Sequence, residues 1–587
     1  MRWSLDVLYT SFDSEEFQKD NEKIISSIEH IRSWTEENLR TYENSKEKLE
    51  YYIRFKNELG DLMVKVRGYS ALSLSVDVKN EKALKALESL ENISTMLAEP
   101  ETKFKRWLLN MPNLEETIQS SSYLKEHEFF IKETVKEAMH LLSEKEETII
   151  AKMKNTGSEA WAKLHDLLTS TLLVDINING EEKKLPLSVV RNMAYDKDPY
   201  IRKTAYFAEL NSYKKIEDAS AACLNGIKGE VITVTELRKY SSPLEMTLQR
   251  SRMDFETLEA MLEAIEEYLP EFRRYLKEKA RLLGHKDGLP FYDLFAPVGK
   301  LDKKFTFDEA KEFIVENFNS FSEDLAQFAK KAFENSWIDA EPREGKRGGA
   351  FCYNLHPIKQ SRILANFDGS FSNVLTLAHE LGHGYHGHLL ANETLINSRY
   401  PMPIAETASI FNEHIIVNSA LKTASKEEKL SIIENSLQRS TQTIVDIYSR
   451  FLFEDEVIKR RKDHSLSVEE LKQIMIEAQK KTYGDGLDQN YLHPYMWINK
   501  PHYYDADLNY YNFPYAFGEL FVKGLIYKYN QEGKKFVEEY KNLLSQTGKK
   551  NLYDLGKIVG FDLHSKDFWR KSLDVIKEEI DQFISLI

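Results

Sequence analysis

The chain is poor in the residues that break or cross-link a fold, with 2 cysteines, 15 prolines and 24 glycines among 587 residues. Two cysteines exclude a disulfide framework and favour a reducing compartment, so a cytoplasmic protein is expected. Sparse turn formers favour long helices over many short strands. The sequence has no run of 18 uncharged apolar residues, so no membrane span is predicted. Its first residues hold Asp6 and no apolar core, so no secretory signal is predicted.

Positive charge is also in deficit, since 80 Lys and Arg face 94 Asp and Glu, a formal net charge of −14. Nucleic-acid binding needs a basic footprint, and an anionic membrane would repel an acidic chain, so neither partner is expected. Hydrophobic residues make up 42% and charged residues 30%, which is ordinary for a globular protein. The length exceeds what one hydrophobic core normally supports, so at least two domains or lobes are expected.

The pattern along the chain is mostly helical, with two interruptions. Residues 13–170 repeat apolar residues at helical spacing, which predicts an N-terminal helical lobe over 1–190 and a second region over 191–587. Asn179-Gly180 lies between two alternating runs and predicts a β-hairpin. Residues 345–353 and 361–367 are typical of short paired strands. The sequence therefore predicts a mostly α fold with a small sheet.

The segment that indicates chemistry is residues 375–386, LTLAHELGHGYH, which contains the pattern His-Glu-x-x-His. On a helix, His379 and His383 lie about 40° apart on one face and one turn from each other, so both imidazoles can reach one zinc ion. Glu380 is rotated by about 100° and misses the ion, but it can lie over a water there. That is the position of the general base in metalloproteases.

A third ligand must come from outside this helix turn. The metzincin pattern requires glycine and histidine where the chain has His386 and Leu389, so that class is excluded. His386 lies two turns from His379 and cannot share its ion, and His388 is interpreted as incidental. The next helix offers Glu406 and Glu413, about 10 Å apart along its axis, so only one of them can bind the metal.

We choose Glu406 as the ligand and assign Glu413 to hydrogen bonding the free ring N–H of a zinc-bound histidine. A catalytic site keeps one position open, so one ion held by His379, His383 and Glu406 suits catalysis. Cobalt or manganese would accept the same donors. Glu413 replaces Glu406 as ligand if the first choice is wrong.

Three segments together resemble oligoendopeptidase F, of the thimet oligopeptidase family of zinc peptidases. They are residues 345–352 (GKRGGAFC), residues 379–383 (HELGH) and residues 405–413 (AETASIFNE). The resemblance covers most of the chain. It implies a Glu at position 406 that completes the zinc site. It also implies two helical lobes around a deep channel that admits short unstructured peptides and excludes folded proteins.

Residues 500–518 are unusually rich in histidine and tyrosine, whose hydroxyls and ring nitrogens can stabilise the oxyanion formed during peptide hydrolysis. Relatives of oligoendopeptidase F carry a His and a Tyr-x-x-x-Tyr pair here. His502, Tyr511 and Tyr515 match that pattern, so the resemblance implies a catalytic role for them. Tyr510 is an alternative to Tyr511, and Gly518 stands where thimet-type members carry a further tyrosine.

Gly348 and Gly349, followed by Ala350, would allow a peptide backbone to approach closely. A strand at this point could add an extended substrate through main-chain hydrogen bonds. The predicted activity is therefore a zinc-dependent endopeptidase acting on short oligopeptides. One alternative is a carboxypeptidase or dipeptidyl carboxypeptidase with similar ligands. A second is a peptide-binding protein with a structural metal, although structural sites usually fill all four positions with protein ligands.

Overall fold

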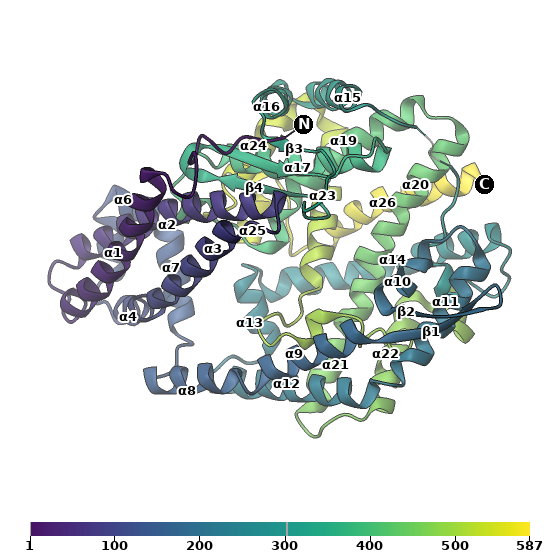
Figure 1. Cartoon of the computed structure of the whole chain (residues 1–587), viewed down its shortest axis with the longest axis horizontal. Coiled ribbons are helices and arrows are strands. Elements are labelled where there is room, and N and C mark those ends of the chain that lie inside the picture. Colours follow the sequence, from purple (N-terminus) through teal and green to yellow (C-terminus); the bar gives the residue numbers. More distant parts are fainter. Residues whose placement is uncertain (1, 301–302) are drawn as a thin grey trace. The chain divides into compact units, whose positions relative to one another are not determined.

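The computed structural model describes residues 2–300 and 303–587, and helices make up most of it, as the sequence predicts (Figure 1). The chain forms two compact units that are each discontinuous in sequence. Unit 1 comprises residues 1–141, 302–422 and 531–559, and unit 2 comprises residues 142–301, 423–530 and 560–587. The division expected near residue 190 falls inside unit 2, because each unit is assembled from segments far apart in the chain.

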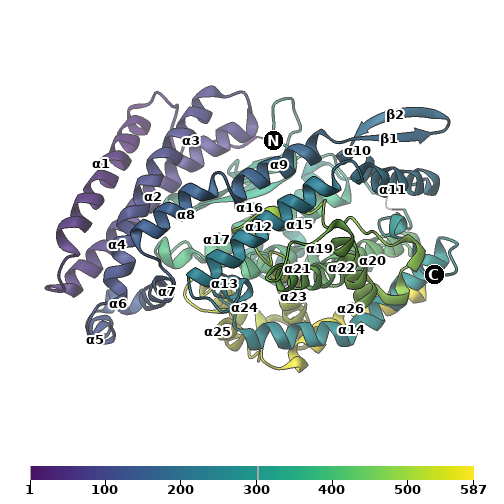
Figure 2. The same ribbon diagram turned by 90° about the horizontal axis from the view of Figure 1, so that it is seen from below.

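Unit 1 begins with a helical layer in which α1, α2, α3 and α4 pack side by side, as Figures 1 and 2 show. Its helices are α1 Glu15–Asn38, α2 Ser45–Val76, α3 Glu81–Ser94, α4 Ala98–Leu109, α5 Leu114–Gln119, α6 Ser122–Glu126, α7 Glu128–Ala138, α15 Phe307–Phe321, α16 Glu323–Glu334, α17 Phe371–Leu389, α18 Met402–Ala405, α19 Thr407–Thr423, α24 Phe536–Ser545 and α25 Leu552–Ile558. Buried Ile28, Leu59 and Leu72 belong to its apolar core.

A small three-stranded sheet lies against α17 in unit 1. Its strands are β3 Ile338–Asp339, β4 Phe351–Leu355 and β5 Gln360–Leu364, in the order β3-β5-β4. β5 is parallel to β3 and antiparallel to β4. The predicted strand pair is confirmed, but the first strand begins at Phe351 rather than at residue 345, because the preceding residues form a loop.

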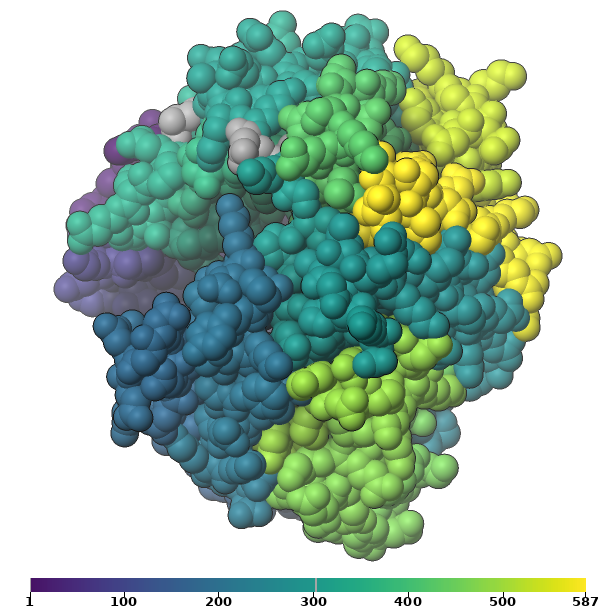
Figure 3. All heavy atoms as spheres, turned by 90° about the vertical axis from the view of Figure 1, so that its right-hand side faces the viewer, coloured from purple at the N-terminus to yellow at the C-terminus, as the bar shows by residue number. Residues whose placement is uncertain are grey.

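Unit 2 contains the predicted hairpin and the long amphipathic helix α14, Phe255–Leu282. Its elements are α8 Glu144–Lys154, α9 Ser158–Thr171, β1 Leu173–Ile178, β2 Glu181–Pro186, α10 Leu187–Asn192, α11 Pro199–Tyr213, α12 Glu217–Leu237, α13 Pro243–Arg250, α14 Phe255–Leu282, α20 Lys426–Thr441, α21 Ile447–Arg461, α22 Val468–Tyr483, α23 Phe513–Glu532 and α26 Lys566–Leu586. The C-terminal α26, yellow in Figure 3, lies along α14.

Local sequence explains several of these element boundaries. In the hairpin, Asn179 and Gly180 both have positive φ, 55° and 88°, as a tight primed turn between twisted strands requires. The capping boxes at Thr306 and Ser467 start α15 and α22, each with its Glu three residues on. Ser370 caps α17 by accepting a hydrogen bond from the Asn373 N–H. None of the described helices is both long enough and apolar enough to cross a lipid bilayer.

Candidate metal centre

The turn of α17 that carries the two histidines faces the start of α19. The rings of His379 and His383 have centroids 4.9 Å apart, and each Nε2 lies near one carboxylate oxygen, Oε2 of Glu406. The distances to that oxygen are 3.2 Å from His379 and 3.3 Å from His383. One ligand atom from each of the three residues lies within 4.8 Å of the other two. Two imidazoles and one carboxylate form a donor set typical of zinc.

Two of these three side chains, His379 and Glu406, each have a further hydrogen-bond partner that orients them. Glu413 Oε1 lies 2.6 Å from His379 Nδ1, the ring nitrogen that does not face Glu406. Ser409 donates a hydrogen bond of 2.7 Å to Glu406 Oε2. A carboxylate behind a metal-binding histidine fixes the ring orientation and the position of its proton. Glu406 and Glu413 thus lie on different sides of His379, with Glu406 near Nε2 and Glu413 near Nδ1.

The electrostatics of this cluster favour positive charge at its centre. Burial lowers the pKa of His379, but hydrogen bonds to Glu406 and Glu413 outweigh burial and raise this pKa to about 10. Burial likewise raises the pKa of Glu406, but its hydrogen bonds to His379 and His383 hold the pKa well below its ordinary value. The two histidines and two carboxylates therefore form a site with a strong preference for a cation, whether proton or metal ion.

Glu380, next to His379, is not part of this donor set. Its side chain is buried, with 6% of the residue exposed, and burial raises the pKa of its carboxyl group. Among the described residues, none donates a hydrogen bond to it. A buried carboxylate without a protein donor remains available to accept a proton from a substrate or a water.

A close crossing of two helices brings the cluster together. A Cβ built on Gly382 would lie 2.5 Å from the Ser409 Cα and 2.6 Å from the Ala408 carbonyl oxygen. No side chain fits there, so glycine at this position lets the backbones of α17 and α19 touch. Asn412 adds a hydrogen bond from its amide to the Ala378 carbonyl, at 3.4 Å. The sequence analysis missed Gly382, although a glycine inside the histidine motif is a signal of close backbone approach.

The remaining histidines of α17 have other contacts. His386 is buried, its Nε2 lies 2.8 Å from Thr547 Oγ1, and its ring stacks on Tyr400 with centroids 4.1 Å apart. His386 therefore packs and forms a hydrogen bond outside the set of candidate metal donors. His388 is exposed and contacts the ring of Phe328, with centroids 5.3 Å apart.

In unit 2, the three aromatic residues singled out by the sequence form one ring cluster. The His502 and Tyr511 rings have centroids 5.2 Å apart, and the Tyr511 and Tyr515 rings are perpendicular at 5.7 Å. Tyr515 is 37% exposed, whereas the alternative Tyr510 is buried and donates a 2.8 Å hydrogen bond to Asp455. The Tyr510 hydroxyl is therefore bonded to Asp455, whereas the Tyr511 ring contacts both His502 and Tyr515.

Comparison with known proteins identifies the family of this chain. Residues 192–575 match the model of peptidase family M3, and residues 96–173 match the model named oligopeptidase F. This chain belongs to peptidase family M3. Its resemblance to oligoendopeptidase F is confirmed, and the M3 chain is a metalloendopeptidase that acts on oligopeptides.

Relatives of this M3 peptidase align over nearly their whole length. Oligopeptidase PepF of Bacillus subtilis is 25% identical over 100% of this chain and 87% of its own. An oligoendopeptidase F homolog of Borreliella burgdorferi is also 25% identical, over 99% of this chain and 97% of its own. The solved oligoendopeptidase-F of Enterococcus faecium has a TM-score of 0.70 at 19% identity, covering 97% of this chain and 99% of its own. The last similarity supports the fold.

The glycine loop of the M3 peptidase precedes β4, and two residues missed by the sequence analysis hold it. The Lys346 ammonium is buried beside Asp339, 2.8 Å from Oδ1, and donates to the carbonyl oxygens of Asp339, Glu341 and Ala365. The Asn366 amide donates to the carbonyl oxygen of Gly349 at 2.9 Å.

At its tip, this loop leaves Gly348 and Gly349 uncovered. A Cβ built on either residue meets no atom within 4 Å, and Gly349 has a φ of +79°. Ala350 follows and leads into β4, which lies at the edge of the sheet within the described residues. The loop is therefore held by Lys346 and by the bond from Asn366 to Gly349, while Gly348 and Gly349 themselves stay exposed.

Proposed function

We propose that this M3 peptidase is a zinc-dependent endopeptidase that cuts internal bonds of short, unstructured oligopeptides. The observation that carries the proposal is the approach of His379 and His383 to one oxygen of Glu406. Two ring nitrogens and one carboxylate oxygen fit a catalytic zinc ion, because three protein ligands leave a position for substrate. When bound, zinc would supply Lewis acidity, polarising the scissile carbonyl and lowering the pKa of a bound water to about 7.

Glu380 moves the proton in this mechanism. Its carboxylate accepts a proton from the attacking water, and the water oxygen forms a bond to the carbonyl carbon. Glu380 then delivers that proton to the amide nitrogen, and the carbon–nitrogen bond breaks to release the amine. The absence of a described hydrogen-bond donor at Glu380 supports this role, because no internal partner competes for the proton. Glu413 holds the His379 ring in place during these steps.

We further propose that His502, Tyr511 and Tyr515 donate hydrogen bonds to the oxyanion formed during the attack. The match to oligoendopeptidase F and the mutual ring contacts support this assignment. The extended substrate binds along Gly348, Gly349 and Ala350 through main-chain hydrogen bonds, which demand little of its sequence. Both cysteines are free thiols, which supports a cytoplasmic location. Cell fractionation would test that location.

The test uses a peptide that is blocked at both ends and a mass measurement of its products. We expect internal cleavage, loss of cleavage with a chelator, and recovery on adding zinc. A carboxypeptidase or dipeptidyl carboxypeptidase would leave the blocked peptide intact and cut only the free form. A peptide-binding protein would leave both forms intact while still binding them. Either of these results would overturn the endopeptidase assignment.

A further inference from the structure

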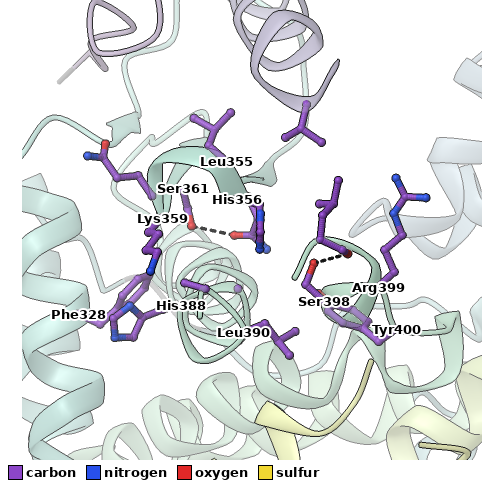
Figure 4. A pocket seen from close by; sticks show the side chains of 16 residues that line it. Phe328, Leu355, His356, Lys359, Ser361, His388, Leu390, Ser398, Arg399 and Tyr400 are labelled. Atoms are coloured by element: carbon purple, nitrogen blue, oxygen red, sulfur yellow. Dashed lines mark hydrogen bonds between the residues drawn. The ribbon is translucent and has the colours of Figure 1, made fainter. Parts of the chain in front are cut away.

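Two groups of polar side chains lie outside the proposed mechanism, one in each unit. In unit 1 they border a cavity of about 410 Å³, which is lined by residues of α17, of the segment after it and of the β4–β5 connection (Figure 4). There Ser361 donates a 2.7 Å hydrogen bond to Asn354, whose amide donates one of 3.2 Å to the His383 carbonyl oxygen. In unit 2 the group is centred on Lys228 of α12 and Glu454 of α21, and its bonds lead to the ring cluster.

The Lys228 ammonium and the Glu454 carboxylate form a buried ion pair. Nζ of Lys228 lies 2.7 Å from Oε1 of Glu454, and the two side chains are only 1% and 2% exposed. Removing two charges from water carries a large desolvation penalty, and apolar residues of similar volume often replace such a pair without loss of stability. Stability of the fold is therefore a weak explanation for this pair, and its other partners indicate what it does.

Each charge of the pair also binds one asparagine. The Lys228 ammonium donates a 2.9 Å hydrogen bond to Oδ1 of Asn509. On the other side, Nδ2 of Asn512 donates a 3.2 Å hydrogen bond to Oε2 of Glu454. Both asparagines are buried. An ammonium can face only the oxygen of an amide, and a carboxylate can face only its NH₂ group, so the ion pair fixes the orientation of both amides. The two residues between the asparagines are thereby held at each end.

The first of these two residues, Tyr510, has an unusual backbone conformation. Its φ is +52°, which a bulky residue adopts only where surrounding contacts impose it. The contacts are a 2.8 Å hydrogen bond from its hydroxyl to Asp455 and a 2.7 Å hydrogen bond from the Asn512 N–H to its carbonyl oxygen. The next residue is Tyr511, whose ring belongs to the ring cluster. The turn therefore keeps Tyr510 inside the protein and leaves Tyr511 in the ring cluster.

Asn512 also forms the start of α23. Its Oδ1 accepts a 2.7 Å hydrogen bond from the Phe513 N–H, and its carbonyl oxygen accepts one of 3.0 Å from the Tyr515 N–H. Tyr515 lies in the first turn of this helix. The residue that binds Glu454 is thus directly connected to both tyrosines of the ring cluster, to Tyr511 through the chain and to Tyr515 through a backbone hydrogen bond.

We propose that Lys228 and Glu454 are positioning residues, which hold residues 509–512 through Asn509 and Asn512 and so fix the Tyr511 hydroxyl where it donates to the oxyanion. The hold on this segment follows from the contacts alone, whereas the oxyanion as the target of Tyr511 rests on the proposed function. Both charged side chains are buried and act only through the two amides. Without the pair, the Tyr511 hydroxyl is present but not fixed, so the rate falls while substrate binding and metal binding persist.

The first test is a double change, Lys228→Met with Glu454→Leu. It removes both charges and roughly preserves side-chain volume, so the chain should still fold. At a temperature where thermal melting shows the variant to be folded, we expect kcat to fall by about 10–100-fold, with KM and zinc content nearly unchanged. A variant with the kcat of the parent chain, or one in which KM or zinc content accounts for the loss, would overturn the proposal.

The chain supplies a matched control within the same unit. Lys279 and Glu434 form a second buried ion pair, with side chains 0% and 1% exposed. Their described hydrogen bonds go to each other, to the Leu294 carbonyl oxygen and to the Tyr275 hydroxyl, all outside residues 509–512. Lys279→Met with Glu434→Leu should therefore keep the parent kcat. An equal fall of kcat in this control would mean that loss of any buried pair damages the enzyme, and the positioning role would be rejected.

Combination with Tyr511→Phe separates positioning from general damage. If the pair acts through the Tyr511 hydroxyl, adding the change of Lys228 and Glu454 to Tyr511→Phe should cause no further loss of kcat. A smaller fraction of active enzyme would instead multiply the loss caused by Tyr511→Phe. Losses that multiply would therefore contradict the proposal.

Hydrogen exchange measured by mass spectrometry gives a result that does not depend on turnover. Backbone amides of residues 509–515 should exchange at least about tenfold faster in the variant of Lys228 and Glu454, while those of α17 keep the parent rate. Unchanged exchange in residues 509–515 would overturn this inference even if Tyr511→Phe is inactive. Faster exchange there, together with full activity of Tyr511→Phe, would reject only the proposed oxyanion role and leave the hold on the segment in place.

Discussion

The candidate metal site of unit 1, called the metal cluster below, consists of His379, His383 and Glu406. It holds its side chains in a different way from the ring cluster of unit 2. In the metal cluster, Glu413 orients His379, and Ser409 donates to Glu406. In the ring cluster, His502 and Tyr511 contact other rings, and no described residue forms a hydrogen bond with the Tyr511 hydroxyl or with the ring nitrogens of His502. The metal-site side chains are held by polar contacts, whereas the Tyr511 hydroxyl and the His502 ring nitrogens have no hydrogen-bond partner among the described residues.

This difference matches two chemical tasks. An ion is bound tightly only if its ligands are already in position, so each ligand benefits from a supporting contact. A donor to a substrate must keep its hydrogen free until the substrate arrives, so a bond within the protein would compete. Changes in the metal cluster should therefore alter metal content, whereas changes in the ring cluster should alter the rate and leave the metal in place.

The largest expected effect comes from Glu406→Ala. This change removes one of three metal donors, and the remaining pair of histidines holds zinc weakly. We expect zinc content to fall below one tenth of the parent value and peptide hydrolysis to fall to background. Metal analysis after dialysis measures the first, and product masses measure the second. A variant with a full complement of zinc would point to Glu413 as the third ligand.

The next effect separates proton transfer from metal binding, at the residue that follows the ligand His379 in the chain. Glu380→Gln keeps the shape of the side chain and removes its ability to accept a proton. We expect kcat to fall by about 10²–10⁴-fold with zinc content unchanged, since general bases contribute on that scale. Activity within tenfold of the parent would reject Glu380 as the base, and loss of zinc would assign it to metal binding instead.

The ring cluster is tested by removing one hydroxyl at a time. Tyr511→Phe and Tyr515→Phe preserve the ring contacts and delete the donors. If each donates to the oxyanion, kcat should fall by about 10²–10³-fold, with zinc content and KM nearly unchanged. Tyr510→Phe is the matched control, because the Tyr510 hydroxyl donates a hydrogen bond to Asp455. Its removal should lower the stability of the fold more than the catalytic rate. A larger rate loss at Tyr510 than at Tyr511 would contradict the assignment.

Local patterns predicted the elements whose determinants lie within a few residues. The spacing of His379 and His383 needs only the helical period, and the turn at Asn179-Gly180 needs only residues that tolerate positive φ. The sequence also indicated Glu406, but by eliminating other residues and through a family resemblance. Its approach to the histidines depends on the contact of two helices across Gly382, which no local pattern specifies.

The start of β4 is another feature that local sequence patterns do not specify. The sequence analysis places a strand from residue 345, yet residues 345–350 form a loop in which Lys346 is buried among carbonyl oxygens and beside Asp339. A lysine in sequence predicts an exposed side chain, and only tertiary contacts supply the partners that compensate for its burial. Likewise, the division into two discontinuous units could not be read along the chain, since each unit joins segments hundreds of residues apart.

The smallest expected effect is that of changing Glu413, whose carboxylate contacts His379 Nδ1. It is also the change that best separates the metal cluster from the ring cluster. Glu413→Gln keeps a hydrogen-bond acceptor for His379 but removes the negative charge, so zinc affinity should fall by about 10–100-fold while some activity returns at high zinc. Competition with a chromogenic chelator measures that affinity. Restoration of kcat by excess zinc would mark Glu413 as a positioning residue. A loss of kcat that zinc cannot restore would place Glu413 in direct contact with the reacting groups, and the two clusters would then differ less than their contacts imply.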